Sequence, residues 1–155
     1  MRTILLSFSP KYYEILKCGE KIFEHRSRFC NEEVEAYIYL GIPHQKLVAH
    51  VTLGKRIPLS EWLEEYRDDQ DTCERISRFM IKNNYAMPIL TFQEIEPIDI
   101  NEIMLEFPQF CIPRSYCYLN NQEKLFEFIK SKTIYKGVKR VNNFNKISKD
   151  IICIC

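Results

Sequence analysis

The segment Tyr12–Arg26 constrains the fold most, because a helix, a sharp stop and a strand follow one another directly. The amphipathic run Tyr12–Cys18 predicts a short helix. Gly19 then provides its left-handed stop, since glycine alone takes a positive φ without a Cβ clash. In the strand that follows, side chains alternate between two faces. One face carries Ile22, Glu24 and Arg26, and the other carries Phe23 and His25. With Lys21 at the start of this strand, the first face is suited to a polar ligand.

Length and composition indicate a single ordered domain. The chain has 155 residues, of which 46% are hydrophobic and 28% charged, enough for a real core. The net charge of +1 excludes a globally basic nucleic-acid binder, so any such role depends on local charge. No apolar run reaches the roughly 20 residues that span a bilayer, and the apolar stretch near Met1 is too short for a signal peptide. We therefore expect a cytoplasmic protein without a membrane partner.

The cysteines and histidines do not form a recognised metal pattern. The chain has 7 cysteines and no C-x-x-C pair, which favours reduced, mostly buried thiols. His25, His44 and His50 have no ligand spacing, and a zinc site built with Cys30 is the weaker alternative. We expect no metal and no cofactor.

Hydrophobic periodicity predicts a run of strands interrupted by helices, an α+β order that suits a small closed or nearly closed barrel. Two capping boxes, at Asp99-x-x-Glu102 and Asn120-x-x-Glu123, mark helix starts. We expect strands at about 2–7, 20–28, 34–40, 46–53, 85–95 and 114–119, with helices at 10–18, within 60–82 as a pair, at 99–104 and from 120.

Two charged segments each have more than one interpretation. The predicted helices of 60–82 are rich in acids, which is typical of a solvated outer face or, less simply, of a protein-interaction surface. The tract 130–149 has seven basic residues and no acid. It fits a solvated tail, or an arm whose cations contact a nucleic-acid backbone. The candidates for such contacts are Lys132, Lys136, Lys139 and Arg140.

The motif Gly19-x-Lys21-x-x-Glu24-x-Arg26 resembles the G-x-K-x-x-E-x-R signature of ASCH domains, a branch of the PUA-like superfamily. Tyr85–Met87 and Pro113–Leu119 look like later segments of small bacterial ASCH proteins described as predicted transcriptional regulators. The resemblance covers about residues 1–130. It implies a PUA-like mixed barrel of about five or six strands, with flanking helices and a helical insertion near 60–82. Residues 131–155 would form a basic C-terminal extension.

The resemblance implies a cleft beside this strand that binds RNA or a modified nucleotide, and a regulatory role for the protein that carries it. Lys21, Glu24 and Arg26 are the first candidate wall. Arg114, Ser115 and Tyr116 are the second, with Tyr116 able to stack on a base. Plainer interpretations stay open, because Glu24 and Arg26 can simply brace the strand and Tyr116 can belong to the core.

An enzymatic alternative follows from the same resemblance. One small ASCH type hydrolyses N4-acetylcytidine with a lysine, a threonine and a glutamate, and another cuts RNA. Lys21 matches that lysine, whereas Glu24 stands where the threonine is expected, so the nucleophile is missing. This departure favours a binding module over an enzyme. The alternative is a hydrolase for acylated cytidines or RNA, with Lys21 and Glu24 as acid and base. The oligomeric state has no signal in the sequence.

Overall fold

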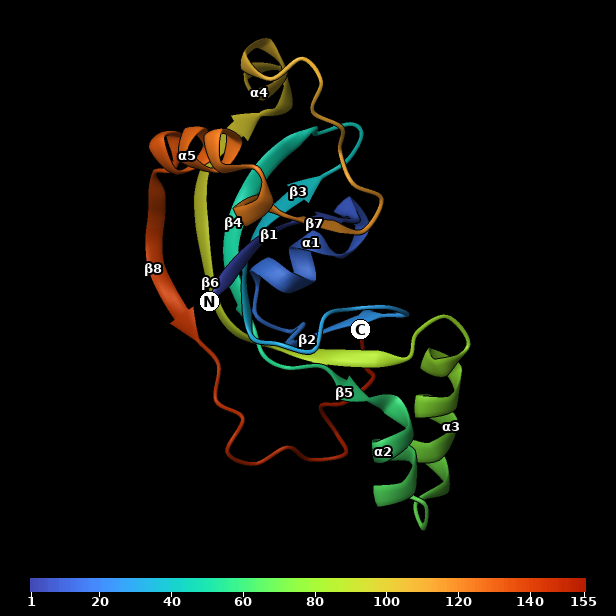
Figure 1. The fold of residues 1–155 in the computed structure, drawn as a ribbon. Coiled ribbons are helices and arrows are strands. Elements are labelled where there is room, and N and C mark those ends of the chain that lie inside the picture. Colours follow the sequence, from blue (N-terminus) through green and yellow to red (C-terminus); the bar gives the residue numbers. More distant parts are fainter.

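The computed structural model describes residues 1–155, which form a strongly curled mixed sheet flanked by helices (Figure 1). The main path of the 8-stranded sheet has the order β2-β6-β4-β3-β1-β7, with β5 and β8 paired to β6. This arrangement confirms the expected α+β class with a barrel-like sheet. The strands are β1 (Arg2–Phe8), β2 (Phe23–Arg26), β3 (Val34–Leu40), β4 (Lys46–Leu53), β5 (Ile57–Pro58), β6 (Tyr85–Asp99), β7 (Tyr116–Tyr118) and β8 (Tyr135–Val141). The helices are α1 (Pro10–Lys17), α2 (Leu59–Glu65), α3 (Gln70–Met80), α4 (Ile100–Glu106) and α5 (Glu123–Lys132), with a short 3-10 turn at Leu119–Asn121.

The first helix begins and ends at the residues that the sequence indicates. Ser9 is the N-cap and Pro10 is the first helical residue, although the Ser9 side chain makes no capping hydrogen bond. Gly19 has φ +90 and reverses the chain into β2. A Cβ here would make only ordinary contact with the Arg140 guanidinium, at 3.4 Å from its Cζ, so the positive φ rather than a lack of space favours glycine.

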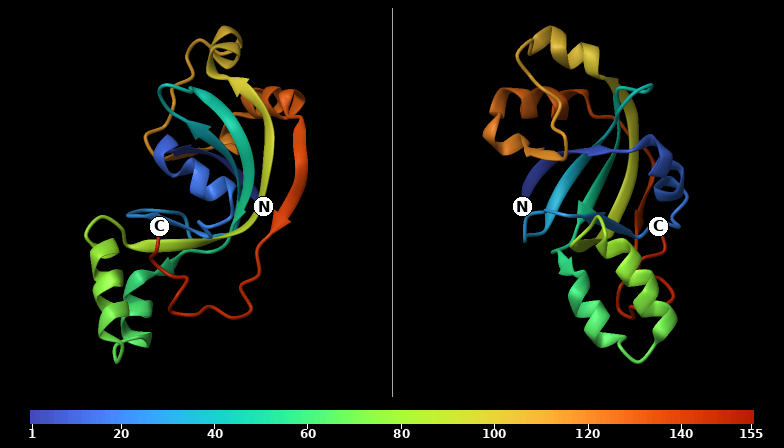
Figure 2. Two further views of the ribbon diagram at one scale, coloured as in Figure 1. Left: turned by 180° about the vertical axis from the view of Figure 1, so that it is seen from behind. Right: turned by 90° about the vertical axis from the view of Figure 1, so that its right-hand side faces the viewer.

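Strand β6 connects the two parts of the curled sheet. Its first residues pair with β2 and β5, whereas its later residues pair with β4 on one side and β8 on the other. Figure 2 shows this strand sweeping along the sheet and bending between the two parts. It continues past Ile95, where the sequence analysis expected it to stop, and runs to Asp99. Pairing with β4 resumes at Ile98 and Asp99, so this neighbour extends the strand beyond Pro97, whereas the pairing with β8 ends at Ile95.

Three apolar clusters hold the elements together. The largest fills the inside of the curl, where side chains from β1, β3, β4 and β6 meet α1. A second lies on the outer face under α4 and α5. The third joins the predicted helical insertion to the sheet: Trp62 of α2 packs its ring 5.1 Å from that of Phe23, and Ile76 of α3 is fully buried beside them. The insertion thus covers the β2 side of the barrel.

The segment after residue 130 folds onto the rest of the chain. It adds β8 to the edge of β6, a strand that sequence periodicity missed. Beyond β8 the chain returns to the helical insertion, where Ile152 and Cys153 are buried. Arg75 holds this return by donating from Nε to the Ile152 carbonyl at 3.1 Å. Residues 131–155 therefore contribute one strand and part of the third cluster.

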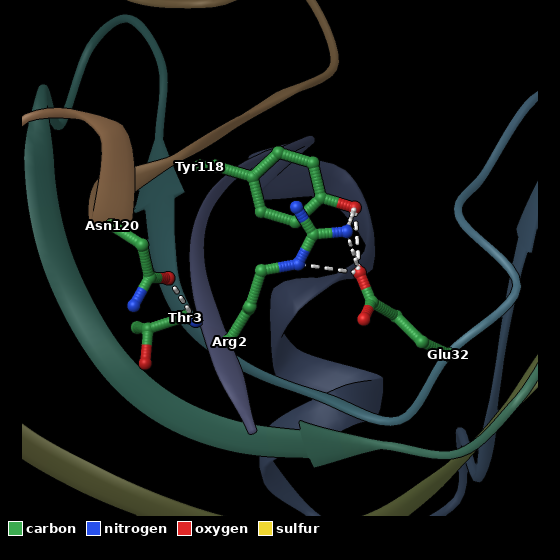
Figure 3. Close-up of polar contacts among 5 residues, drawn as sticks. All are labelled: Arg2, Thr3, Glu32, Tyr118 and Asn120. Carbon is green, nitrogen blue, oxygen red and sulfur yellow. Dashed lines mark hydrogen bonds and ion pairs between the residues drawn. The ribbon is translucent and has the colours of Figure 1, made fainter.

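The expected capping box at Asn120 is wrong. Helix α5 begins at Glu123, and Asn120 Oδ1 instead accepts a hydrogen bond from the Thr3 backbone N–H at 2.7 Å (Figure 3). Close by, Arg2 donates from Nε to Glu32 at 2.9 Å and lies 3.8 Å from the centre of the Tyr118 ring. Tyr118 also donates its hydroxyl to Glu32 at 2.9 Å. These contacts fix β1 against β7, so tertiary pairing overrides the local capping pattern.

Arg140 is the main link between β8 and α1, and its removal should destabilise the fold. Its guanidinium donates to the carbonyls of Leu16 at 2.8 Å and Lys17 at 2.9 Å, and lies 4.7 Å from the centre of the Phe92 ring. We expect Arg140→Ala to lower the free energy of unfolding by about 1–3 kcal/mol, measured by urea denaturation. The exposed neighbour Lys139 is the matched control, and Lys139→Ala should change little. Equal stability of the two variants would contradict this role.

Candidate functional site

A pocket of about 530 Å³ lies where the edge strand β2 faces the end of β1, the start of α1 and the end of α3. Three of the residues predicted from the motif line it together: Lys21, Glu24 and Arg26. The C-terminal end of the chain reaches the same place, beside β2 (Figure 1). The other lining residues are Ser7, Phe8, Ser9, Tyr12, His25, Phe79, Lys82, Asn83 and Cys155.

Lys21 is a buried cation in this pocket, only 3% exposed. Its backbone N–H donates to the Ile15 carbonyl at 2.9 Å, which ties the start of the strand to the end of α1. Its Nζ donates to the main-chain oxygen of Cys155 at 2.8 Å and lies 5.9 Å from the centre of the Tyr12 ring. An ammonium has three donors, and this single hydrogen bond leaves capacity for a ligand.

Glu24 is 7% exposed, and only one of its two carboxylate oxygens has a hydrogen-bond donor. Its Oε1 accepts from the His25 backbone N–H at 3.0 Å and lies 3.5 Å from Arg26 Nε. Its Oε2 is buried without any hydrogen-bond partner. A buried carboxylate oxygen without a donor is costly, so this atom is a candidate ligand acceptor.

Arg26 closes the gap between the two edges of the curled sheet. One terminal nitrogen donates to the Ser7 carbonyl at the end of β1 at 2.7 Å, and the other to Ser115 Oγ at 3.4 Å. Because β2 and β1 are not paired as strands, this side chain provides polar contacts across the gap. The guanidinium is thereby held in one position beside Glu24.

His25 belongs to the site, although the motif did not single it out. It is 9% exposed, its ring centre lies 4.7 Å from that of Phe79, and neither ring nitrogen has a hydrogen-bond partner. Burial, assisted by the nearby Lys21 charge, lowers the pKa of His25 to about 3. The imidazole is therefore neutral at physiological pH and offers one donor and one acceptor.

The second predicted wall is only partly at the pocket. Ser115 does not line the pocket, but its hydroxyl accepts a hydrogen bond from Arg26, which does. Arg114 is exposed and lines an adjoining hollow of about 350 Å³ that shares Ser7 and Ser9 with the main pocket. Tyr116 packs against Phe29 at a ring-centre distance of 4.9 Å, next to the inner cluster. The plainer interpretation of Tyr116 as a packing residue fits this geometry.

The remaining wall comes from parts of the chain that have no local motif. Phe79, Lys82 and Asn83 follow from the position of α3 over β2, and Cys155 from the return of the C-terminal segment. Only three-dimensional contacts bring these residues to the site, so no spacing rule predicts them.

No three histidine, cysteine or acidic side chains are grouped to hold a metal ion. None of the helices combines the length and the apolar composition that a membrane-spanning segment needs.

Solved structures decide the fold family. The chain superposes on an ASCH protein from Zymomonas mobilis with a TM-score of 0.60 at 17% identity, covering 86% of this chain and 96% of that one. The chain has the ASCH fold. Two single-residue variants of the Zymomonas ASCH protein superpose with TM-scores of 0.65 and 0.61 at 16% identity, over 86% of this chain. No protein-family model and no curated protein sequence matches the chain.

Because His25 is neutral in the folded protein, the free energy of unfolding should decrease as the pH falls. Its pKa falls from an ordinary 6.5 to about 3 in the folded state, so between these values the unfolded chain binds the extra proton. Stability is then lost as pH falls below 6.5, with a slope of up to about 1.4 kcal/mol per pH unit. We expect His25→Phe to flatten this dependence in urea unfolding between pH 7.5 and 4.5.

The exposed His44 provides the control, because His44→Phe lies outside the pocket and should keep the wild-type slope. Some dependence will remain in His25→Phe, since burial also lowers the pKa of His50. A slope that His25→Phe leaves unchanged would show that His25 accepts its proton in the folded protein.

Proposed function

We propose that this protein is a binding module for RNA or a modified nucleotide, and that the ligand enters the pocket of Lys21, Glu24, His25 and Arg26. The observation that carries the proposal is the set of unsatisfied polar atoms in the wall: Glu24 Oε2 and both nitrogens of His25. Such atoms cost stability unless a ligand or an ordered water supplies the missing hydrogen bonds. The ASCH fold is compatible with this role.

The donors, acceptors and charges of the pocket match those that a nucleotide presents. Glu24 accepts, and an exocyclic base amine is a suitable donor. Neutral His25 both donates and accepts, so it suits a base edge that carries both kinds of group. Lys21 adds a positive charge for a phosphate or carbonyl oxygen, and the rings of Tyr12 and Phe79 supply apolar lining.

Three lysines near the C-terminus offer separate contacts to a nucleic-acid backbone. Lys132 lies at the end of α5, and Lys136 and Lys139 lie on β8; all three are exposed. Arg140 differs, because its guanidinium is already engaged with the two carbonyls at the end of α1. We assign phosphate contacts to the lysines and a mainly structural role to Arg140.

Binding should depend on Lys21 and Glu24. We expect wild-type protein to bind at least one probe in a panel of ribonucleoside monophosphates and a short single-stranded RNA. Lys21→Met and Glu24→Gln should each weaken that binding about tenfold or more, a loss of about 1.4 kcal/mol, by isothermal titration calorimetry. Arg26 is left out of this test because its side chain also contacts Ser7 and Ser115 across the gap, so its removal would affect folding as well as binding.

Matched controls are the exposed Lys11→Met and Glu14→Gln on α1, which should bind as wild type. Reversing the charges of Lys136 and Lys139 should weaken RNA binding and reduce its salt dependence, while monophosphate binding stays unchanged. Indistinguishable affinities for wild type, Lys21→Met and Glu24→Gln would reject the pocket as the binding site.

Hydrolysis of an acylated cytidine is a second candidate function. It is favoured by the presence of an ammonium and an unpaired carboxylate oxygen in the same pocket. In this scheme Lys21 and Glu24 divide the acid and base roles while water attacks the acyl carbonyl. Released carboxylic acid, measured by chromatography, should disappear in Lys21→Met and persist in Lys11→Met. Absence of turnover, or turnover that Lys21→Met retains, would leave the binding module alone.

A further inference from the structure

A second hollow lies on the outer face of the sheet, away from the pocket of Lys21 and Glu24. It measures about 280 Å³ and is formed where β1, β3 and β4 are roofed by α5 and the start of β8. The inner cluster uses the alternate positions of the same strands, such as Ala36 between Glu35 and Tyr37. Because neighbouring side chains of a strand point to opposite faces, this hollow is separated from the barrel interior by the sheet.

Aromatic rings form its walls. His50 of β4 lies between Tyr37 and Tyr135, with ring-centre distances of 5.1 Å and 6.0 Å, and both tyrosine rings stand nearly perpendicular to the imidazole. Phe126 of α5 adds a further ring to the lining. Such a concave, ring-lined space accepts a flat heterocycle, and its volume limits the occupant to about the size of one base with part of a sugar.

Two polar groups in this hollow have unused hydrogen-bonding capacity. His50 is 9% exposed, and its imidazole makes ring contacts rather than hydrogen bonds. Glu35 has a single weak side-chain contact, with Thr3 Oγ1 as donor at 3.4 Å from Oε2. By contrast, the Tyr37 hydroxyl is satisfied by Thr133 Oγ1 at 3.0 Å. Among the less exposed side chains, the free capacity therefore belongs to one carboxylate and one imidazole, and the exposed Tyr135 hydroxyl at the rim also makes no hydrogen bond within the protein.

A cation completes the rim. Lys130 pairs with Glu127 at 2.7 Å and lies 4.4 Å from the centre of the Phe126 ring. This ion pair is on the helix surface, so a ligand oxygen or ring nitrogen can share the ammonium. The hollow thus offers acceptors from Glu35 and a donor from Lys130, with aromatic surfaces nearby.

We propose that this outer hollow binds a guanine base. Guanine presents two neighbouring N–H donors, at N1 and the 2-amino group, which a carboxylate accepts side by side, and its O6 and N7 accept from a cation or an imidazole. Adenine has acceptor nitrogens beside its amine, and uracil has carbonyl oxygens on both sides of its N–H. Adenine and uracil would therefore each place an acceptor atom against the Glu35 carboxylate, which is itself an acceptor. Cytosine offers only its amine.

Calorimetric titration of the full chain with free nucleosides tests the base. We expect guanosine to bind, inosine, which lacks the 2-amino group, to bind several-fold more weakly, and adenosine to bind at least about tenfold more weakly. These comparisons need no variant, so they do not depend on folding of a mutant. Equal affinity for guanosine and adenosine, or no binding of guanosine, would overturn the proposal. Binding of tetramethylammonium in its place would also overturn it, because that result would identify an aromatic cage for cations.

Variants locate the site and separate it from the proposed function. Glu35→Gln should weaken guanosine binding about tenfold or more, whereas the exposed neighbour Glu33→Gln should not. Glu24→Gln should leave guanosine binding at the outer hollow unchanged, so failure of one site is distinguishable from failure of the other. Guanosine binding that survives in Glu35→Gln would reject the assignment.

The source of the base is tested by a short single-stranded oligoribonucleotide with one central guanine. Its replacement by adenine should weaken binding if the hollow reads guanine within RNA. Binding of free guanosine together with indifference of the oligonucleotide to this replacement would limit the proposal to a free nucleoside or nucleotide.

Discussion

The Arg26 guanidinium is the interaction on which the site depends. The sheet curls until β2 and β1 approach, but these strands do not pair, and one side chain spans the gap to the Ser7 carbonyl and Ser115. By fixing Arg26, the barrel also fixes Glu24, whose Oε1 lies 3.5 Å from the guanidinium. The pocket therefore lies where β2 and β1 are joined by the Arg26 side chain and not by backbone hydrogen bonds between strands.

The wall of this pocket is only partly satisfied. Arg26 has good acceptors, whereas Glu24 Oε2 and both nitrogens of His25 lack partners. Burying such groups costs free energy, which the donors and acceptors of a ligand would offset. The low pKa of His25 is another consequence of the same burial. A partly unpaired polar wall of this kind is expected at a functional site, where ligand recognition costs stability.

Local sequence patterns predicted the elements nearest to this pocket well. The stop at Gly19, the alternation along β2 and the helical pair of the insertion all follow from backbone preferences and periodicity. The sequence analysis missed β8, whose residues are nearly all exposed and so leave no hydrophobic pattern. It also misplaced the cap at Asn120, because the contact with Thr3 is formed between distant segments. His25 was overlooked as a site residue, since its orphaned nitrogens become evident only when α3 covers it.

Glu24 can serve a ligand or can brace the barrel through Arg26, and the two roles differ in their effect on stability. The free energy of unfolding of Glu24→Gln, measured by urea denaturation without any ligand, separates them. Arg26 keeps its hydrogen bonds to Ser7 and Ser115 in this variant, and a charged oxygen buried without a donor is costly, so the substitution should leave the free energy of unfolding equal or higher. A loss of more than about 2 kcal/mol would instead assign Glu24 to bracing, because it would show that the ion pair with Arg26 holds β2 against the end of β1.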